Sequence, residues 1–150
     1  MKAKVLNKKE VKRIINSLDE QYSISSLKLD YIFILGSDDK LYLIDKKFAE
    51  LNLIDLRVNS LGLYFGKLED GKVRLSIEGS QIVGPLARKN IITLSKNQIS
   101  DWVRGSNVDV NTDCKGFVLV KHGDDFFGSG KCSKGVLFNY VPKNRRIRAS

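Results

Sequence analysis

Hydrophobic residues follow a helical period near the start of the chain. The apolar positions of this stretch are three or four residues apart, at Val11, Ile14, Ile15 and Leu18. Asn7 precedes them as a candidate N-cap, and Glu10 stands three residues later, as in a capping box with Asn in place of Ser or Thr. The pattern predicts an amphipathic helix that begins just after Asn7.

Short apolar runs of β type, separated by turn residues, predict two hairpins in the first half of the chain. Their strands are Tyr31–Leu35 with Leu41–Ile44, and Gly62–Leu68 with Lys72–Ile77. The Asp-Gly pair in the second turn is a strong hairpin signal. We expect two further helices, at Lys46–Leu53 with Asp45 as its cap and at Glu78–Arg88, which Gly84-Pro85 should kink.

The second half of the chain has a β-rich pattern of its own. A strand at Ile91–Leu94 is followed by a helix at Lys96–Val103, with Ser95 as its cap and Gly105 after its end. Three strands joined by Gly/Asp and Ser/Gly turns are then predicted at Gly116–His122, Phe126–Cys132 and Val136–Val141. We place a domain boundary between residues 88 and 89, which gives two small domains, 1–88 and 89–150.

Net charge separates these two domains. The chain carries 26 Lys and Arg against 17 Asp and Glu, a formal charge of +9, of which +3 lies in residues 1–88 and +6 in residues 89–150. This asymmetry indicates a polyanionic partner for the C-terminal domain, with nucleic acid as the first candidate. The alternative is that the charge serves only solubility.

A cluster of basic residues directly follows the last predicted strand. Because the cluster adjoins a compact β unit, it can present charge to phosphates at fixed spacing, whereas a frayed terminus would not. The residues expected to bind RNA phosphates are Arg104, Lys121, Lys131, Lys134, Lys143, Arg145, Arg146 and Arg148.

Residues with catalytic or metal-binding chemistry are few. Cys114, Cys132 and His122 lack the close spacing of a zinc site, and as three ligands they would leave a tetrahedral site incomplete. We expect the cysteines to be small buried or half-buried residues; a disulfide between them would be unusual in a cytosolic mesophile. Asp124 and Asp125 are interpreted as turn residues. The sequence predicts no enzyme activity, no metal and no cofactor.

The segment Gly128–Lys131 superficially resembles a phosphate-binding loop. It lacks the first glycine, since Asp125 stands there, and Cys132 replaces the Ser or Thr after the lysine. We interpret it as a glycine-rich strand that lets either a packed helix or an RNA strand approach. Trp102 is expected to be half-buried between the two domains, with base stacking as the alternative, and Tyr140 carries the same ambiguity.

Two stretches resemble the Nip-seven family of ribosome-biogenesis proteins. The first is the hairpin formed by Leu61–Leu68 and Gly71–Ile77, and the second comprises Pro85–Ala87 and Arg104–Val108. The order of elements is similar over nearly the whole chain. This resemblance implies an N-terminal α/β domain, a C-terminal PUA domain that binds RNA, a role in maturing large-subunit ribosomal RNA, and no catalytic activity.

The C-terminal third is more similar to the PUA-like tail of the Nol-one/Nop-two/Sun RNA methyltransferases. The residues that carry this resemblance are Gly116–Val120, Phe127–Lys131 and Asn139–Arg145. The chain departs from that family because nothing corresponds to its large cofactor domain with paired cysteines. Both resemblances imply an RNA-binding module of PUA type.

Together, these features predict an α+β fold in which an antiparallel sheet with helices is followed by a small PUA-like β-barrel. The expected function is non-catalytic RNA binding in ribosomal RNA processing and large-subunit ribosome biogenesis. The alternatives are an RNA-binding accessory subunit of a methyltransferase system, or a protein-interaction adaptor with incidental basic charge. We expect ribosomal RNA or its precursor as the partner, protein partners at hairpin residues such as Tyr42, Tyr64 and Lys67, and no membrane. The expected location is cytoplasmic in a prokaryote or nucleolar in a eukaryote.

Overall fold

A computed structural model describes residues 3–25, 27–48 and 62–148 of the chain. The chain forms two compact units, which we call unit 1 (Met1–Arg74) and unit 2 (Leu75–Ser150). Residues 75–88 therefore fold with the C-terminal sheet, although the domain boundary was expected between residues 88 and 89; that boundary stays a prediction. The charge asymmetry does not depend on this choice, because unit 1 also carries +3 and unit 2 also carries +6.

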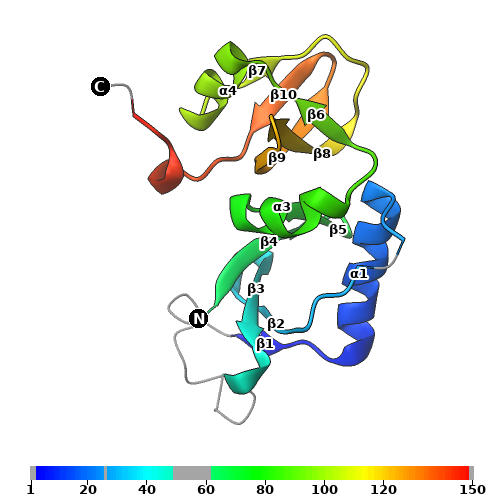
Figure 1. Cartoon of the computed structure of the whole chain (residues 1–150). Coiled ribbons are helices and arrows are strands. Elements are labelled where there is room, and N and C mark those ends of the chain that lie inside the picture. Colours follow the sequence, from blue (N-terminus) through cyan, green and yellow to red (C-terminus); the bar gives the residue numbers. More distant parts are fainter. Residues whose placement is uncertain (1–2, 26, 49–61, 149–150) are drawn as a thin grey trace. The chain divides into compact units, whose positions relative to one another are not determined.

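Unit 1 is a five-stranded sheet accompanied by one long helix, α1 (Lys8–Tyr22) (Figure 1). Neighbouring strands in the sheet follow chain order, and the pairs from β1 to β4 are antiparallel. The strands are β1 (Lys4–Val5), β2 (Tyr31–Leu35), β3 (Lys40–Asp45), β4 (Leu63–Glu69) and β5 (Lys72–Leu75). Two short 3-10 helices flank β3, at Ser37–Asp39 and at Lys46–Phe48.

The predicted capping box of α1 is confirmed. The Glu10 amide donates to Asn7 Oδ1 at 2.9 Å, and the Asn7 amide donates to Glu10 Oε1 at 3.1 Å. The hydrogen bond from Lys4, followed by that from the Asn7 amide, lowers the pKa of the Glu10 carboxyl from its usual value. The helix buries Ile14 and Leu18 on one face, as their spacing predicts.

The Asp-Gly turn between β4 and β5 is also confirmed. Asp70 and Gly71 have φ values of 52° and 76°, the left-handed pair that a tight hairpin requires. The helix expected at Lys46–Leu53 is present only as the 3-10 turn Lys46–Phe48, with Asp45 Oδ1 accepting from the Lys47 amide at 2.9 Å. Residues 49–53 lie outside the described residues.

Unit 2 is a mixed sheet that curls into a half-barrel, with two α-helices (Figure 1). Its strand order is β6-β8-β9-β10-β7, and β6 runs parallel to β8. The strands are β6 (Ile91–Thr93), β7 (Val108–Asp109), β8 (Gly116–His122), β9 (Asp125–Ser133) and β10 (Val136–Asn139). The helices are α3 (Ile77–Val83) and α4 (Lys96–Val103), with 3-10 turns at Gly84–Leu86 and Lys143–Arg145.

The predicted fold class is thus confirmed: an antiparallel sheet with helices precedes a curled, half-barrel sheet. The predicted kink at Gly84-Pro85 is confirmed as the change from α3 to a 3-10 turn. The two-residue strands β1 and β7 and the parallel pairing of β6 were not predicted, because none of them has a local sequence signature. Among the helices that the structure describes, none has the length and hydrophobicity needed to cross a bilayer.

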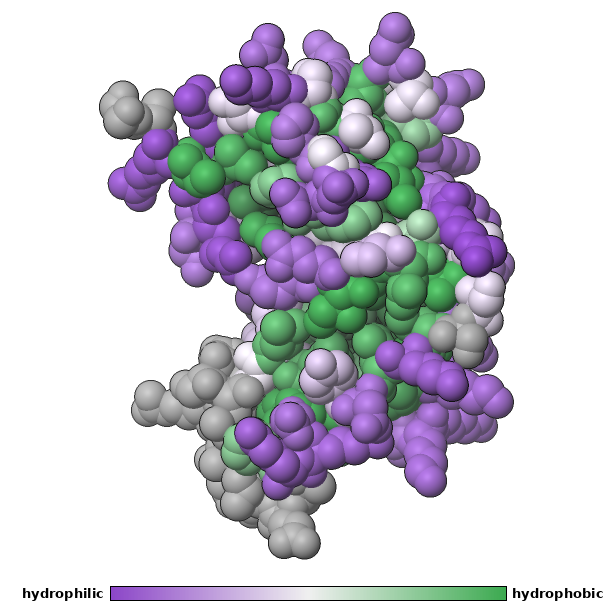
Figure 2. Space-filling model, viewed as in Figure 1, coloured by the Kyte–Doolittle hydropathy of each residue, from purple (hydrophilic) through white to green (hydrophobic). Residues whose placement is uncertain are grey.

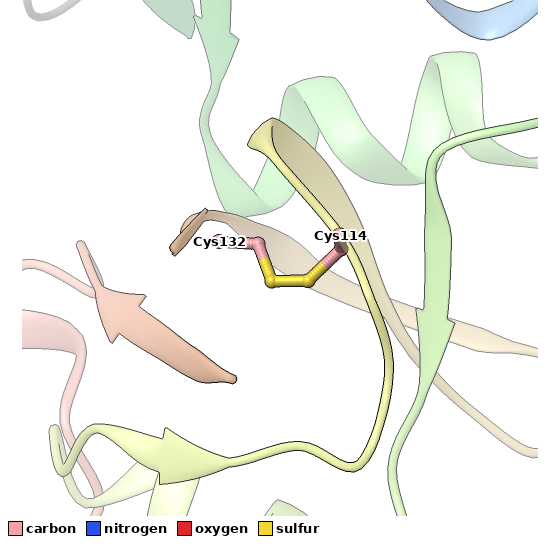
Figure 3. Close-up of a disulfide and its surroundings, with 2 residues drawn as sticks. All are labelled: Cys114 and Cys132. Carbon is pink, nitrogen blue, oxygen red and sulfur yellow. A yellow bond between two sulfur atoms is a disulfide. The ribbon is translucent and has the colours of Figure 1, made fainter. Parts of the chain in front are cut away.

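A disulfide joins Cys114 and Cys132 within unit 2 (Figure 3). Cys132 belongs to β9 and is 1% exposed, and Cys114 lies in the segment that leads into β8. The Cα atoms are 5.6 Å apart, a distance typical of bonded cysteines. The cysteines are buried and half-buried as expected, but they are joined, although the sequence had not settled whether they were.

Candidate nucleic-acid interface

The glycine-rich segment of β9 is a packing surface for α3. The Gly128 amide donates to Ser80 Oγ at 2.8 Å, and Ser129 Oγ donates to the Leu75 carbonyl at 2.7 Å. A Cβ at Gly128 would lie 3.5 Å from Ile77 of the helix. Gly128, Ser129 and Gly130 are all buried. Of the two approaches that the glycines could allow, a packed helix is the one observed, and no phosphate loop forms.

Trp102 lies in the core of unit 2. Its side chain is 0% exposed, and its Nε1 donates to the Phe127 carbonyl at 2.9 Å. A Cβ at Gly130 would meet the Trp102 ring at 2.7 Å, so this glycine makes room for the indole. The half-buried position expected for Trp102 and the base-stacking alternative are both wrong, because no face of the ring reaches the surface.

The side chain of Asn139 fixes the position of the chain just before residues 142–148, which we call the basic C-terminal segment. Its Nδ2 donates to the carbonyls of Trp102 and Ser106, at 2.8 and 2.9 Å, while its Oδ1 accepts from the Val141 amide at 2.8 Å. Its own amide donates to Asn107 Oδ1 at 2.9 Å. The end of β10 is thereby joined to the end of α4, so the residues that follow start from a defined position. Sequence reasoning did not single out Asn139.

The basic C-terminal segment is held by three contacts of its own. Arg145 forms an ion pair with Glu78 of α3. Arg146 Nε donates to the Val141 carbonyl at 3.1 Å and its side chain lies against Gly105, where φ is +98° and a side chain would collide with the guanidinium. The Ile147 amide donates to the Val103 carbonyl at 2.8 Å. The expectation of an anchored segment rather than a frayed end is confirmed up to residue 147.

These contacts divide the eight predicted phosphate-binding residues into two groups. Arg145 is paired with a carboxylate, Arg146 is half-buried, and Lys121 and Lys131 lie over aromatic rings, at 5.6 Å from the Phe126 centroid and 5.7 Å from the Phe117 centroid. The remaining residues are exposed and form no ion pair within the described part of the chain: Arg104, Lys134, Lys143 and Arg148. This second group is available to an external anion, and so is Lys131, which is exposed and whose charge the Phe117 ring does not neutralise.

The end of the chain is also devoid of acidic residues. Residues 126–150 contain six Lys and Arg but no Asp or Glu. The described portion of this segment includes most of β9, all of β10 and the basic C-terminal segment. Any carboxylate near residues 126–150 has to come from another part of the chain, as that of Glu78 does. The charges of the segment itself therefore contribute only positive electrostatic potential.

A second feature of unit 2 is one face of its sheet that carries aromatic residues and a lysine. Phe117 lies on β8, Lys131 on β9 and Phe138 on β10, and Tyr140 directly follows β10. Phe117 and Phe138 are the partners of Lys131 on either side of β9. The rings of Phe117 and Tyr140 meet edge to face, with centroids 6.5 Å apart. Phe117 is 7% exposed, whereas Phe138 is 41% exposed. The alternation around the core residue Leu137 could have identified Phe138 as outward-facing.

His122, Asp124 and Asp125 lie at the connection between β8 and β9. His122 Nδ1 donates to the Leu94 carbonyl at 2.8 Å, and it connects β8 to the segment before α4. Gly123 and Asp124 form the tight turn between His122 and its partner Asp125. The turn interpretation is confirmed for Asp124, whereas Asp125 is the first residue of β9. In the described ranges, His, Cys, Asp and Glu side chains form no group of three that could hold a metal ion.

Comparison with known proteins identifies the class of unit 2. Residues 89–147, about two fifths of the chain, match the model of the PUA domain of methyltransferase RsmF. The PUA-like character expected from the C-terminal resemblance is thus confirmed, and a PUA domain indicates RNA binding. A comparison with curated proteins finds no match. The resemblance to the Nip-seven family stays a prediction.

Proposed function

We propose that this protein is a non-catalytic RNA-binding protein and that unit 2 holds the RNA. The match of residues 89–147 to a PUA domain is the observation that carries this proposal. The positive, acid-free segment 126–150 and the exposed cations Lys143 and Arg148 support it. Both cations belong to an anchored segment, so they can position an RNA backbone as well as attract it.

For the RNA itself, we propose ribosomal RNA or its precursor. One version is a role in ribosomal RNA processing and large-subunit biogenesis, which the resemblance to the Nip-seven family supports. The other is an accessory role beside a separate RNA methyltransferase, which the match to a methyltransferase PUA domain favours. Crosslinking in cells, followed by sequencing of the bound RNA and identification of co-purifying proteins, separates the two. Pre-ribosomes would support the first version, and a methyltransferase the second.

The salt dependence of binding tests the RNA proposal directly. Each phosphate neutralised on single-stranded RNA contributes about −0.7 to the slope of log K against log salt. The double variant Lys143→Ala/Arg148→Ala should flatten the slope by about 1.4 and weaken binding to many RNA sequences alike. The matched control is Lys9→Ala/Lys28→Ala, which removes two exposed cations from unit 1. A wild-type protein without affinity for RNA at low salt would reject the proposed function.

A second candidate function is docking of a protein partner on unit 1. A groove of about 450 Å³ lies between α1 and the strands β1 and β2. Figure 2 shows apolar residues gathered on the visible side of unit 1 and bordered by hydrophilic ones. The groove lining includes Val5, Val11, Ile15 and Tyr31, with Lys8 and Lys12 along α1.

The positive charge along this groove indicates what kind of partner would bind there. Lys8 and Lys12 are exposed and have no ion pair in the part of the chain that the structure describes, whereas Lys46 is paired with Asp30. An acidic, amphipathic segment of a partner protein would satisfy both the apolar lining and the lysines. Of the docking residues expected from the hairpins, Tyr42 is corrected, because it is only 8% exposed and packs against Tyr64, with ring centroids 5.8 Å apart. Tyr64 and Lys67 are half-buried and stay predictions.

Two synthetic peptides test this docking. An 18-residue helix with Leu on one face and Glu on the other should bind the full chain saturably, while the same helix with Lys for Glu should not. Lys8→Glu/Lys12→Glu should abolish the preference without affecting RNA binding. Failure of the Glu peptide to bind, or equal binding of both peptides, would reject the docking proposal.

A further inference from the structure

We propose that the Phe138 ring stacks on an unpaired RNA base and that Lys131 contacts the phosphate backbone beside it. The proposal rests on the proposed function, since it names the kind of RNA that unit 2 takes: a single strand with an accessible base. Its starting point is the register of β9 and β10, which makes Phe138 the direct partner of Lys131. Directly paired side chains of this kind share one face of a sheet.

The exposure of Phe138 follows from the strand pattern. Leu137 is 0% exposed and belongs to the core of unit 2, so the next residue, Phe138, has to face outward. It remains 41% exposed, although a Phe on a strand face usually packs against a neighbour. Phe117, on the same face, is covered in this way, by Tyr140 at its edge and by the ammonium group of Lys131 above it.

Phe138 lies where the strand pairing of β10 changes on one side. The edge strand β7 pairs with β10 only at Val136 and Leu137, so β10 has no strand partner on that side at Phe138. On the other side β9 continues to pair, through Lys131 and Gly130. Beyond Leu137 that side of β10 is instead held by the contacts of Asn139 with Asn107 and Ser106, so a planar group has to approach the exposed Phe138 ring from the face of the sheet.

The backbone next to Phe138 is held by hydrogen bonds. The next residue, Asn139, is held by its own amide and by its side chain, which bonds to the carbonyls of Trp102 and Ser106. A ring on such a backbone loses little conformational freedom when a base stacks on it. Every base has a π-face, so this kind of contact tolerates many sequences.

The charge next to the ring suits a nucleic acid. Lys131 is exposed and forms no ion pair with the described residues, and β9 after Asp125 and all of β10 contain no carboxylate. A lysine beside an aromatic ring can neutralise the phosphate of the nucleotide whose base stacks there. An acidic protein could pair a carboxylate with Lys131, but a carboxylate has no aromatic plane that could stack on Phe138.

The test uses the full chain and two fluorescent single-stranded RNAs, oligo(U) and oligo(A) of ten nucleotides. Phe138→Ala should weaken binding about 10-fold or more, because a stacked base is worth on the order of 1–3 kcal/mol. Its salt slope should equal that of the wild type, since no phosphate contact is lost. Phe138→Tyr should restore affinity, whereas Phe138→Leu, which keeps apolar bulk without a π-face, should not.

Three further variants make the test more specific. Leu63→Ala is the control, because Leu63 is a large apolar residue of β4 that is 37% exposed on unit 1, and its removal should leave RNA affinity unchanged. Lys131→Ala should flatten the salt slope by about 0.7. Phe138→Trp provides an independent readout: RNA should quench the new indole, while the wild-type protein, with only the buried Trp102, should show no such quenching.

The outcomes separate the two proposals. RNA binding by the wild type that is unchanged in Phe138→Ala and equally strong in Phe138→Leu overturns base stacking and leaves the proposed function intact. A wild type that binds neither RNA overturns both. An affinity loss in Phe138→Ala that Phe138→Leu fully restores also overturns stacking, because it would show that apolar bulk alone is needed.

Discussion

Asn139 Nδ2 donates a hydrogen bond to the main-chain carbonyl of Trp102, 2.8 Å away, and so joins the last strand to the end of α4. The same side chain also bonds to the Ser106 carbonyl and to the Val141 amide. Trp102 is the largest fully buried side chain of the described residues. The start of the basic C-terminal segment is thus connected to the residue with the largest fully buried side chain among those described.

This relationship makes Asn139 a stability determinant. Asn139→Asp keeps the shape of the side chain but replaces its NH₂ donor with an oxygen that faces two carbonyls. Asn139 is half-buried, so losing its two donated hydrogen bonds and placing a charge opposite the two carbonyls should lower the free energy of unfolding by about 1–2 kcal/mol. Urea denaturation followed by far-UV circular dichroism measures it. Asn144→Asp, on the exposed 3-10 turn, is the control; an equal effect of both substitutions would contradict the assignment.

The ion pair between Glu78 and Arg145 should restrain RNA binding. Glu78→Gln frees the Arg145 guanidinium and removes one negative charge near the basic segment. We expect tighter RNA binding and a salt slope steeper by about 0.7, equivalent to one more phosphate contact. Arg145→Ala should have a smaller effect than Arg148→Ala, because its charge is already compensated in the free protein.

Fluorescence anisotropy at four salt concentrations checks this prediction. The double variant Glu78→Gln/Arg145→Ala serves as the control and should lose the gain. Stability should change little, since exposed ion pairs contribute at most about 1 kcal/mol. An affinity of Glu78→Gln below that of the wild type would show that the pair positions Arg145 for RNA instead of competing with it.

Reduction of the disulfide should destabilise unit 2. Cys114 and Cys132 are separated by 18 positions, and a bond that closes a loop of that length stabilises a domain by about 3 kcal/mol. Thermal unfolding with and without a reducing agent should show the difference. Cys114→Ala is the control, because its unfolding temperature should be low in both conditions. A wild-type protein insensitive to reductant would show that the two thiols are not bonded in solution.

Alkaline pH should unfold the protein through Tyr22. The side chain is 0% exposed, and burial raises its pKa above the usual value of about 10. Because the folded pKa is the higher one, this contribution is fully present below about pH 10 and declines as pH rises, by about 1.4 kcal/mol per unit.

Urea titrations from pH 9 to pH 11 check the slope. Tyr22→Phe removes the ionisable group and should make the alkaline decline shallower, although it also loses the hydrogen bond from Gln21 Nε2 to the Tyr22 hydroxyl. The same slope in Tyr22→Phe and in the wild type would mean that other groups account for the alkaline decline.

Local features of this chain were predictable because their causes lie within a few residues. The capping box of Asn7 and Glu10 and the turn at Asp70 and Gly71 require only neighbouring side chains and backbone. Strand β2 and helix α4 have the bounds that their patterns predict. Since apolar periodicity reflects burial on one face, it was sufficient to define the α+β fold class.

The candidate site was predicted only in part. The positions of the exposed cations Lys143 and Arg148 follow from composition, because long charged residues at a chain end remain in solvent. Phe138 was missed because a Phe in a strand is usually assigned to the core, and only its register opposite Lys131 makes its exposure informative.

By itself, the sequence determined the periodicity of the elements, the caps and turns between them, and the excess of positive charge toward the C-terminus. Only the tertiary structure decided which partners meet over long separations: Glu78 with Arg145, 67 positions apart, and β6 in parallel with β8. It also decided that Trp102 is buried and that Cys114 bonds Cys132. The physical reason is that such contacts depend on chain packing as a whole, for which no short segment carries a signal.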